Sequence, residues 1–491
     1  MTIKRTLAWL LAATVSLALL GSCGGDKGDG EVVETYQPET VEAIDDALQS
    51  DYTADAETVA YLEALKKTFS ELSASPVADF KIADTDGGVA VTDYLGQDKV
   101  VRIPDTFDGK AVVAVSDAAF ADCKTLEKLY IPDTVVTYGK GILKGCSSLK
   151  ALHAPLPAGE DAYLGYLFGA SAYTDNARDI PSSLAYFELG GALTELPAHA
   201  LFDCNDLVLV TMPASVTSLG AYALYNCESL LELDVSGMTR ISEHALDSCA
   251  SLTRLAFGEA LTELGFGALQ GCDGLRRLTL SIVGDGGENG YLGYTFGATV
   301  PDFAKGHYPP YLTEVTLLPT CKSLGDYAFF ECETLERVTF AEGIASIGVR
   351  AFSGCIRLET VGVAVVDGCV RLESADLPAS LESIRENAFF GCLSLTSLSF
   401  AEGSALESIG VNAFYKCGQL KEIVLPASLK ALPASCFADC FSLETVDLGG
   451  VVTVGKNAFH RCTRLSSATL TDGAVIEDGN EPLDRVIAPK E

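Results

Sequence analysis

Residues 328–340 read AFFECETLERVTF, and residues 388–400 read AFFGCLSLTSLSF. Ala, two Phe, Cys and Leu stand at the same offsets in both stretches. The shared phrase is Cys-x-x-Leu with an apolar residue three positions before the Cys, and it occurs thirteen times, mostly at spacings of 22 or 23 residues. Its Cys residues are Cys123, Cys146, Cys204, Cys227, Cys249, Cys272, Cys332, Cys355, Cys369, Cys392, Cys417, Cys440 and Cys462.

Each unit of about 23 residues carries a Leu-x-x-Leu-x-Leu stretch typical of a short strand, then a turn, then a short helical stretch. No such unit can bury its apolar side alone, whereas stacked units bury a continuous core. The sequence therefore predicts an α/β repeat fold. We expect a solenoid over residues 78–471 with one continuous parallel sheet and a short helical or irregular opposite side.

The cysteines allow two interpretations. An exported chain meets oxidising conditions, which favours disulfides or a metal site. One Cys per unit at a fixed phase instead favours a ladder of buried thiols that pack as small apolar groups, and no paired Cys-x-x-Cys of the zinc kind occurs. Cys436 fills a position that holds Ala in ten units, and Cys321 has no place in the pattern.

The first 22 residues have the features of an export signal. Lys4 and Arg5 precede an apolar run at 7–20 that is too short to span a bilayer comfortably. The run ends in LGSC at 20–23, which resembles the lipobox of bacterial lipoproteins. The resemblance implies cleavage before Cys23 and a lipid on its sulfur, so we expect a membrane partner reached through an anchor. The alternative is an ordinary signal peptide with an unrelated Cys.

The other segments follow from composition. Residues 23–30 contain GGDKGDG and predict a flexible tether after the lipidated Cys23. Residues 31–77 form a predicted helical N-terminal segment, in which Val59, Leu62 and Leu65 share one helical face. Residues 472–491 are a predicted C-terminal tail or cap.

Charge and motifs narrow the function classes. The formal net charge of −33 argues against a nucleic-acid partner, because such a protein must neutralise phosphates. No His-Glu-x-x-His motif, nucleophile elbow or phosphate-binding loop appears, so no enzyme, catalytic residue, metal site or cofactor is predicted. DTDGG at 84–88 and GDGGENG at 284–290 only faintly resemble calcium loops, and turns are the favoured interpretation.

The unit Ile-Gly-x-x-Ala-Phe-x-x-Cys-x-x-Leu-x-x-Ile-x-Ile-Pro resembles the BspA-like leucine-rich repeat. The lead-in at 87–110, with GGVAVTDY and VVRIP, also looks like that family. The resemblance implies a cell-surface protein, since members are largely surface proteins of anaerobic bacteria and some protists. It implies adhesion only for some members, and this chain lacks the immunoglobulin-like modules of larger ones.

Two interruptions enlarge the repeat around 155–187 and 281–313. They contain YLGYLFGA at 163–170 and YLGYTFGA at 291–298. One interpretation makes them ligand-binding flaps that expose Tyr163, Tyr166, Tyr291 and Tyr294. The other makes them enlarged repeats whose aromatic rings pack on the flank of the solenoid.

Arg254, Arg276, Arg277 and Arg337 occupy strand positions that face outward on the concave side in leucine-rich repeats. If the second insertion loops out, these arginines line up on neighbouring strands and suit carboxylate or sulfate groups. The alternative is ordinary charge pairing between strands with residues such as Glu232 and Asp376.

Together these features predict a non-enzymatic, lipid-anchored binding protein with a protein or glycan of a host or bacterial surface as partner. We expect an adhesin-like outer-membrane lipoprotein displayed at the cell surface, the periplasmic face being the alternative. Two other functions remain open. One is a glycan- or peptide-capture lipoprotein of an uptake system, and the other is an architectural envelope protein.

Overall fold

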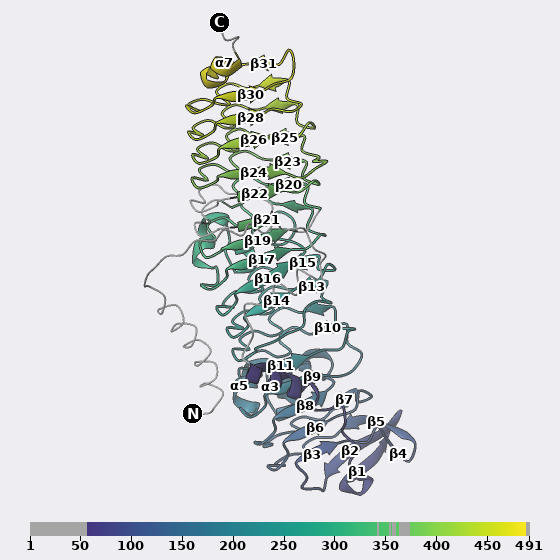
Figure 1. The fold of residues 1–491 in the computed structure, drawn as a ribbon. Helices are drawn as coiled ribbons and strands as arrows, with labels where there is room; N and C mark the ends of the chain where they lie inside the picture. Colours follow the sequence, from purple (N-terminus) through teal and green to yellow (C-terminus); the bar gives the residue numbers. More distant parts are fainter. Residues whose placement is uncertain (1–55, 341–342, 353–354, 356–359, 363–373, 488–491) are drawn as a thin grey trace. The chain divides into compact units, whose positions relative to one another are not determined.

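The computed structural model describes residues 56–340, 343–352, 355, 360–362 and 374–487. The chain divides into two compact units, Met1–Ser73 and Ala74–Glu491. The first unit contains α3 (Ala56–Lys66), which lies within the segment predicted to be helical. The second unit is a stack of coils whose strands pair in parallel from one coil to the next (Figure 1).

The first strand of each coil, which in most coils follows the Cys-x-x-Leu phrase, builds the predicted parallel sheet. Its hydrogen bonds run in three stretches, and an isolated bridge from Leu209 to Glu232 extends the first of them. The strands are β3 (Val100–Arg102), β6 (Lys128–Tyr130), β8 (Ala151–Ala154), β9 (Tyr186–Leu189), β11 (Leu209–Thr211), β14 (Arg254–Ala256), β16 (Arg277–Leu280), β17 (Glu314–Leu317), β19 (Arg337–Phe340), β21 (Thr360–Gly362), β22 (Ser374–Leu377), β24 (Ser397–Phe400), β26 (Glu422–Val424), β28 (Thr445–Asp447) and β30 (Ser467–Thr469).

A second set of strands, which the sequence analysis did not predict, forms from the Leu-x-x-Ile-Gly phrase. Most are only two residues long, too short for an alternating pattern to show in the sequence. They are β5 (Lys110–Val115), β7 (Thr137–Tyr138), β10 (Glu195–Leu196), β12 (Ser218–Leu219), β13 (Arg240–Ile241), β15 (Glu263–Leu264), β18 (Ser323–Leu324), β20 (Ser346–Ile347), β23 (Ser383–Ile384), β25 (Ser408–Ile409), β27 (Ala431–Leu432), β29 (Thr453–Val454) and β31 (Val475–Ile476).

The glycine that ends this phrase has a packing reason. A Cβ on Gly348 would lie 2.4 Å from the backbone nitrogen of Asp326 in the preceding coil, and one on Gly410 would lie 2.3 Å from that of Glu386. Neighbouring coils approach here backbone to backbone, which only a residue without a side chain permits.

The short 14-residue spacing after Cys355 changes one sheet and not the other. Strand β21 lies between β19 and β22 in the first sheet. In the second sheet β20 pairs directly with β23. Within the described residues the short unit therefore adds a strand to the first sheet alone. Cys369 itself lies outside those residues.

The Ala-Phe phrase forms a turn rather than a helix in the regular coils. Two residues four positions apart have positive φ, such as Asn412 at 56° and Lys416 at 63°. Between them every second N–H donates to the next coil: Asn412 to the oxygen of Ala434 at 3.3 Å, and Lys416 to that of Ala438 at 2.9 Å. The irregular alternative for this side thus holds in the regular coils.

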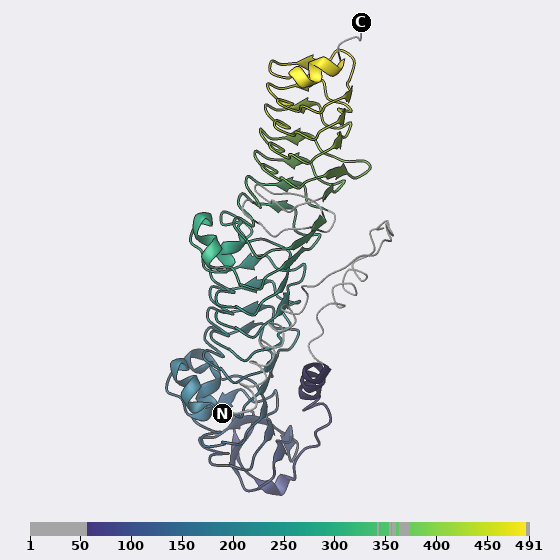
Figure 2. The same ribbon diagram turned by 60° about the vertical axis from the view of Figure 1, so that its left-hand side comes forward.

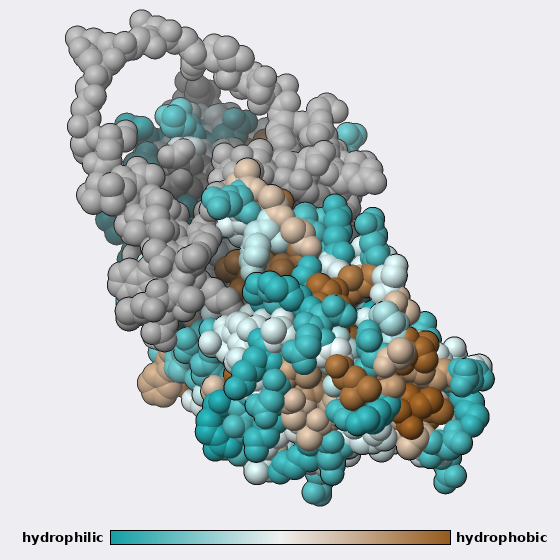
Figure 3. All heavy atoms as spheres, turned by 90° about the horizontal axis from the view of Figure 1, so that it is seen from below, coloured by the Kyte–Doolittle hydropathy of each residue, from teal (hydrophilic) through white to brown (hydrophobic). Residues whose placement is uncertain are grey.

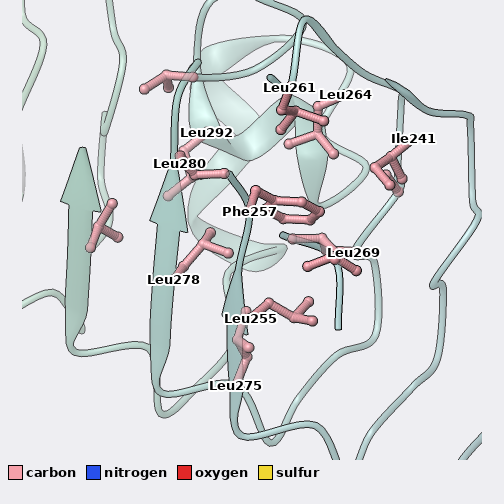
Figure 4. Packing of buried hydrophobic residues seen from close by; sticks show 14 of the residues in the cluster. Ile241, Leu255, Phe257, Leu261, Leu264, Leu269, Leu275, Leu278, Leu280 and Leu292 are labelled. Carbon is pink, nitrogen blue, oxygen red and sulfur yellow. The ribbon is translucent and has the colours of Figure 1, made fainter. Parts of the chain in front are cut away.

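The core lies between the two sheets and the Ala-Phe turns. Leu255 and Leu278 on β14 and β16 point inward, toward Phe257 and Leu269, and Ile241 and Leu264 point into the same core from the second sheet (Figure 4). Phe rings stack from coil to coil, with centroids 4.2 Å apart for Phe389 and Phe414 and 5.0 Å apart for Phe414 and Phe437. Burying each such side chain stabilises the fold by about 1.5–3 kcal/mol.

The two insertions carry most of the helices and project from the same side of the stack (Figures 1 and 2). The first holds η2 (Gly159–Asp161), α4 (Leu164–Phe168), η3 (Tyr173–Asp175) and α5 (Asn176–Asp179). The second holds α6 (Leu292–Thr295) and η4 (Pro301–Gly306).

Each insertion helix takes the place of an Ala-Phe turn. Gly141 and Leu143 donate their N–H groups to the oxygens of Tyr166 and Leu167, at 3.1 and 2.7 Å. Gly267 makes the equivalent bond to Tyr294 at 3.0 Å. The insertions are therefore enlarged coils that remain in the hydrogen-bonded stack.

The ends of the stack are closed differently. At the start, η1 (Val77–Asp79) leads into the antiparallel hairpin of β1 (Phe80–Thr85) and β2 (Gly88–Tyr94), and β4 (Thr106–Phe107) pairs with β5. DTDGG forms the turn of this hairpin, as favoured above. The surface at this end is a mosaic of hydrophilic and hydrophobic residues (Figure 3). At the other end α7 (Glu481–Ile487) places Leu483 in the core.

Candidate functional site

The outward positions of the first sheet carry a charged row. Arg254 on β14 lies in register with Arg277 on β16, Arg277 with Glu314 on β17, and Glu314 with Arg337 on β19. Inward neighbours such as Leu255 are buried, because side chains alternate along a strand. Three of the four predicted arginines therefore share one row, in which Glu314 on β17 lies between Arg277 and Arg337.

The row differs from the prediction in one member. The insertion was expected to loop out, yet it returns to the sheet as β17 and places Glu314 between Arg277 and Arg337. A signal for this strand exists in the sequence, since Leu312, Val315 and Leu317 repeat the apolar spacing of the other units without their Cys.

Glu314 pairs with both neighbouring arginines. Its Oε2 lies 2.9 Å from Nε of Arg277, and its Oε1 lies 3.3 Å from Nη1 of Arg337. The Glu314 and Arg277 side chains are 19% and 20% exposed, whereas that of Arg337 is 54% exposed. Cross-strand pairing thus orders the row, and Arg337 presents much of its side chain to solvent.

Arg276 lies outside this row. It precedes the first residue of β16, and its Cζ stands 4.9 Å from the ring centroid of Tyr311, which comes from the second insertion. A cation over an aromatic face is attracted to it. The structure therefore links Arg276 to the edge of the insertion and not to the arginines of the sheet.

A second outward row, which the sequence analysis missed, lies in the earlier coils. Arg102, Tyr130, His153 and Glu188 are successive register partners. The Arg102 guanidinium lies 3.7 Å from the Tyr130 ring centroid, and the Tyr130 and His153 rings stack at 4.0 Å. His153 also contacts Asp133, Nε2 to Oδ1 at 3.2 Å. The alternating positions in KLY and LHA were the available signal.

The insertion tyrosines pack into the fold. Tyr163 is 6% exposed and its hydroxyl donates to the oxygen of Ala170 at 3.3 Å, while Tyr291 is 5% exposed and bonds Ala298 at 2.9 Å. These two rings are not exposed flaps, because both ends of each side chain are held. Tyr166 and Tyr294 are half-buried. Burial raises the pKa of Tyr291 and of Tyr294.

The cysteines of the described coils are thiols that lie inside the stack. All are buried except Cys123, which is half-buried, and Cys321 and Cys436 are buried as well. Many donate to a carbonyl one coil earlier, as Cys227 does to Leu201 at 3.3 Å. Among the described residues no group of three or more His, Cys, Asp or Glu side chains is placed to hold a metal ion.

Two of the predicted features concern the membrane. Cys23 and the apolar run before it lie outside the described residues. Among the helices that are described, none has the length and hydrophobicity needed to cross a bilayer.

Comparison with known proteins identifies the type of repeat. The family model of the BspA type leucine rich repeat region matches six copies, over residues 103–159, 180–284, 307–366 and 360–478. No curated protein matches the chain.

Several solved structures are similar to this chain at low identity. One is a leucine-rich repeat protein from Bacteroides ovatus, 20% identical, covering 82% of this chain and 99% of that chain with a TM-score of 0.36. Another is a leucine rich cell surface protein from Faecalibacterium prausnitzii, 17% identical, covering 86% and 99% with a TM-score of 0.24. An internalin from Listeria monocytogenes is 16% identical, covering 62% and 79% with a TM-score of 0.27.

The matched ranges span well over half of the chain and coincide with the coils that carry the Cys-x-x-Leu phrase. The chain therefore belongs to the BspA type leucine rich repeat family.

Proposed function

We propose that this protein is a lipid-anchored binding protein of the cell surface that contacts another protein through the outward face of its first sheet. The observation that carries the proposal is the row formed by Arg254, Arg277, Glu314 and Arg337 on four adjacent strands. Arginine is enriched at protein interfaces and pairs with carboxylates through its planar fork.

The row suits a protein partner for two reasons. Strand pairing and the Glu314 bridges hold the side chains in place before binding, which lowers the ordering cost of association. A net charge of −33 opposes the binding of a nucleic acid, which is itself negatively charged. The arginines concentrated in one row nevertheless provide a local site for an acidic patch on a protein.

The binding test compares arginines of the row with an arginine of similar exposure that lies outside it. Arg254→Ala and Arg337→Ala together remove the outer members of the row and are expected to weaken binding by about tenfold or more. The probes are purified host-matrix and bacterial surface proteins on a biosensor. Arg240→Ala is the control, because Arg240 is 51% exposed and pairs with Glu263 on the second sheet. If the double variant and the Arg240→Ala control bind the partner with equal affinity, the outward face of the first sheet is not the binding surface.

The anchor and the display site need a separate test. Cys23→Ser is expected to abolish labelling by a radioactive fatty acid and to release the protein from membranes. Protease treatment of intact cells should then remove the wild-type repeat domain while a periplasmic marker survives. Protection in intact cells, lost on permeabilisation, would place the protein in the periplasm and favour a capture or envelope function instead.

A further inference from the structure

A pocket of about 530 Å³ lies beside the second insertion, away from the row of the first sheet. One wall is the loop at 287–290, and the other is the flank of the following coils at Ser323, Asp326, Ser346 and Arg385. The volume falls within the range of small-molecule sites, roughly 300–1,000 Å³.

The loop wall is held in place without a ligand. The Asp285 carboxylate accepts the N–H groups of Gly287 and Asn289 at 2.8 and 3.0 Å, and the Asn289 side-chain amide at 2.8 Å. The loop also lies directly on the next coil, since a Cβ on Gly325 would stand 2.9 Å from the oxygen of Gly290. A ligand would therefore enter a site whose walls are already ordered.

Hydroxyl groups line the flank. Ser323 on β18 and Ser346 on β20 are register partners, and the buried Leu324 and Ile347 beside them show that the serines face outward. Parallel strands lie about 4.8 Å apart, so the two hydroxyls are neighbours. Each can donate and accept a hydrogen bond, which suits a ligand that itself carries adjacent hydroxyls.

A charged pair completes the polar part of the wall. Asp326 Oδ1 accepts the Val349 N–H at 2.8 Å and lies 3.6 Å from Nη1 of Arg385. The carboxylate only accepts hydrogen bonds and the guanidinium only donates them. A hydroxylated neutral ligand can use both groups, whereas a charged ligand is attracted by one of them and repelled by the other.

The remaining lining is apolar or aromatic. Val300, which is 42% exposed, Pro301 and the half-buried Tyr327 contribute it. A sugar ring has apolar C–H faces and a hydroxylated rim, and thus matches a wall that offers both kinds of surface. We propose that this pocket binds a neutral carbohydrate unit, independently of the protein contact made by the first sheet.

The test uses saturation-transfer difference NMR on the full mature chain with methyl glycosides of glucose, galactose, mannose and N-acetylglucosamine at millimolar concentration. At least one glycoside should bind. Arg385→Ala and Asp326→Asn should each weaken that binding by about tenfold or more. Asp326→Asn keeps an acceptor for the Val349 N–H, so the loss should occur with an unchanged melting temperature.

Two further variants serve as controls for the binding measurement. Ser346→Trp should fill the pocket and abolish binding, while Arg240→Ala, an arginine of the second sheet outside the pocket lining, should leave binding unchanged. Binding of phosphate, glucuronate or spermidine in place of the neutral glycosides would overturn the proposed ligand class. Glycoside binding that survives all pocket variants, or no binding by any glycoside, would overturn the site.

Discussion

The thiol of Cys462 donates a hydrogen bond to the carbonyl oxygen of Phe437, one coil earlier, across 3.1 Å. The same bond joins Cys440 to Phe414 at 3.3 Å and Cys272 to Leu246 at 3.2 Å. The repeated Cys therefore does more than fill space, since it also supplies a donor to a buried carbonyl group. This explains why the position holds Cys rather than Ala in coil after coil.

Replacing one such thiol should measure this contribution. In Cys227→Ala the carbonyl of Leu201 loses its donor and a small cavity opens, so we expect a loss of about 1–3 kcal/mol. Thermal and urea unfolding of the variant and the wild type provide the measurement. Cys123→Ala is the control, because Cys123 is half-buried at the first coil. An equal or larger effect at Cys123 would show that the buried bond contributes little.

The thiols also predict a loss of stability in alkali. Burial raises the pKa of Cys146 to about 12 and that of Cys249 and Cys272 well above the ordinary value of 9.0. The folded chain keeps protons that the unfolded chain releases. Stability is thus complete below about pH 9 and falls as the pH rises above it, by at most about 1.4 kcal/mol per pH unit for each thiol.

Urea unfolding at pH values on both sides of 9 checks the sign and the slope. In Cys249→Ala the free energy of unfolding should decline less steeply with pH, because one thiol with a raised pKa is gone. The buried tyrosines continue to contribute to the decline. A wild-type stability that is flat or rises through this window would contradict the buried, protonated ladder.

Asn480 is expected to hold the last coil closed. Its Oδ1 accepts the Phe459 N–H at 2.9 Å, in the place where a further coil would offer a carbonyl, and its Nδ2 donates to the oxygens of Gly455 and Glu477 at 3.0 and 2.7 Å. Asn480→Ala leaves these buried groups unpaired, at a local cost of about 1–3 kcal/mol.

Hydrogen exchange read along the chain is the right measurement for Asn480→Ala. Amides of the last coil should exchange faster while those of the central coils are unchanged, because a solenoid is stabilised between nearest neighbours. Asp472→Asn, at an exposed position of the same end, should leave the pattern as in the wild type. Faster exchange throughout the stack would contradict the capping role.

The turn residues with positive φ predict an unusual order of stability among substituted variants. Ser435 has φ 54° and its N–H donates to the oxygen of Lys456 at 2.9 Å, so its backbone has to stay in this conformation. Ser435→Gly should be tolerated, and Ser435→Val should be less stable than it by about 1–3 kcal/mol. The same pair at Ser442, where φ is not positive, should lack this preference for Gly. Equal melting temperatures of the two Ser435 variants would refute the strain.

The arginine row was predicted only in part from the sequence. Arg254 and Arg277 were placed on neighbouring strands from the spacing of the repeat, and the structure confirms it. Arg337 was placed beside them, yet β17 separates it from Arg277. The return of the insertion to the sheet was missed because that coil lacks the Cys by which the units were recognised.

The aromatic insertions show the limit of a local pattern. YLGYLFGA and YLGYTFGA favoured packed coils but left exposed flaps open as an alternative. Only the backbone bonds from Gly141 to Tyr166 and from Gly267 to Tyr294 show that each insertion occupies the place of a regular turn.

The sequence by itself determined the repeat, the parallel sheet and the buried phase of Leu, Phe and Cys, because a period of about 23 residues forces every unit to fill the same core position. Only the tertiary structure decided the second sheet, the place of Glu314 between two arginines, and the pocket between residues 287–290 and Arg385. These features depend on hydrogen bonds and register between coils far apart in the chain, and no local pattern of residues encodes such distances.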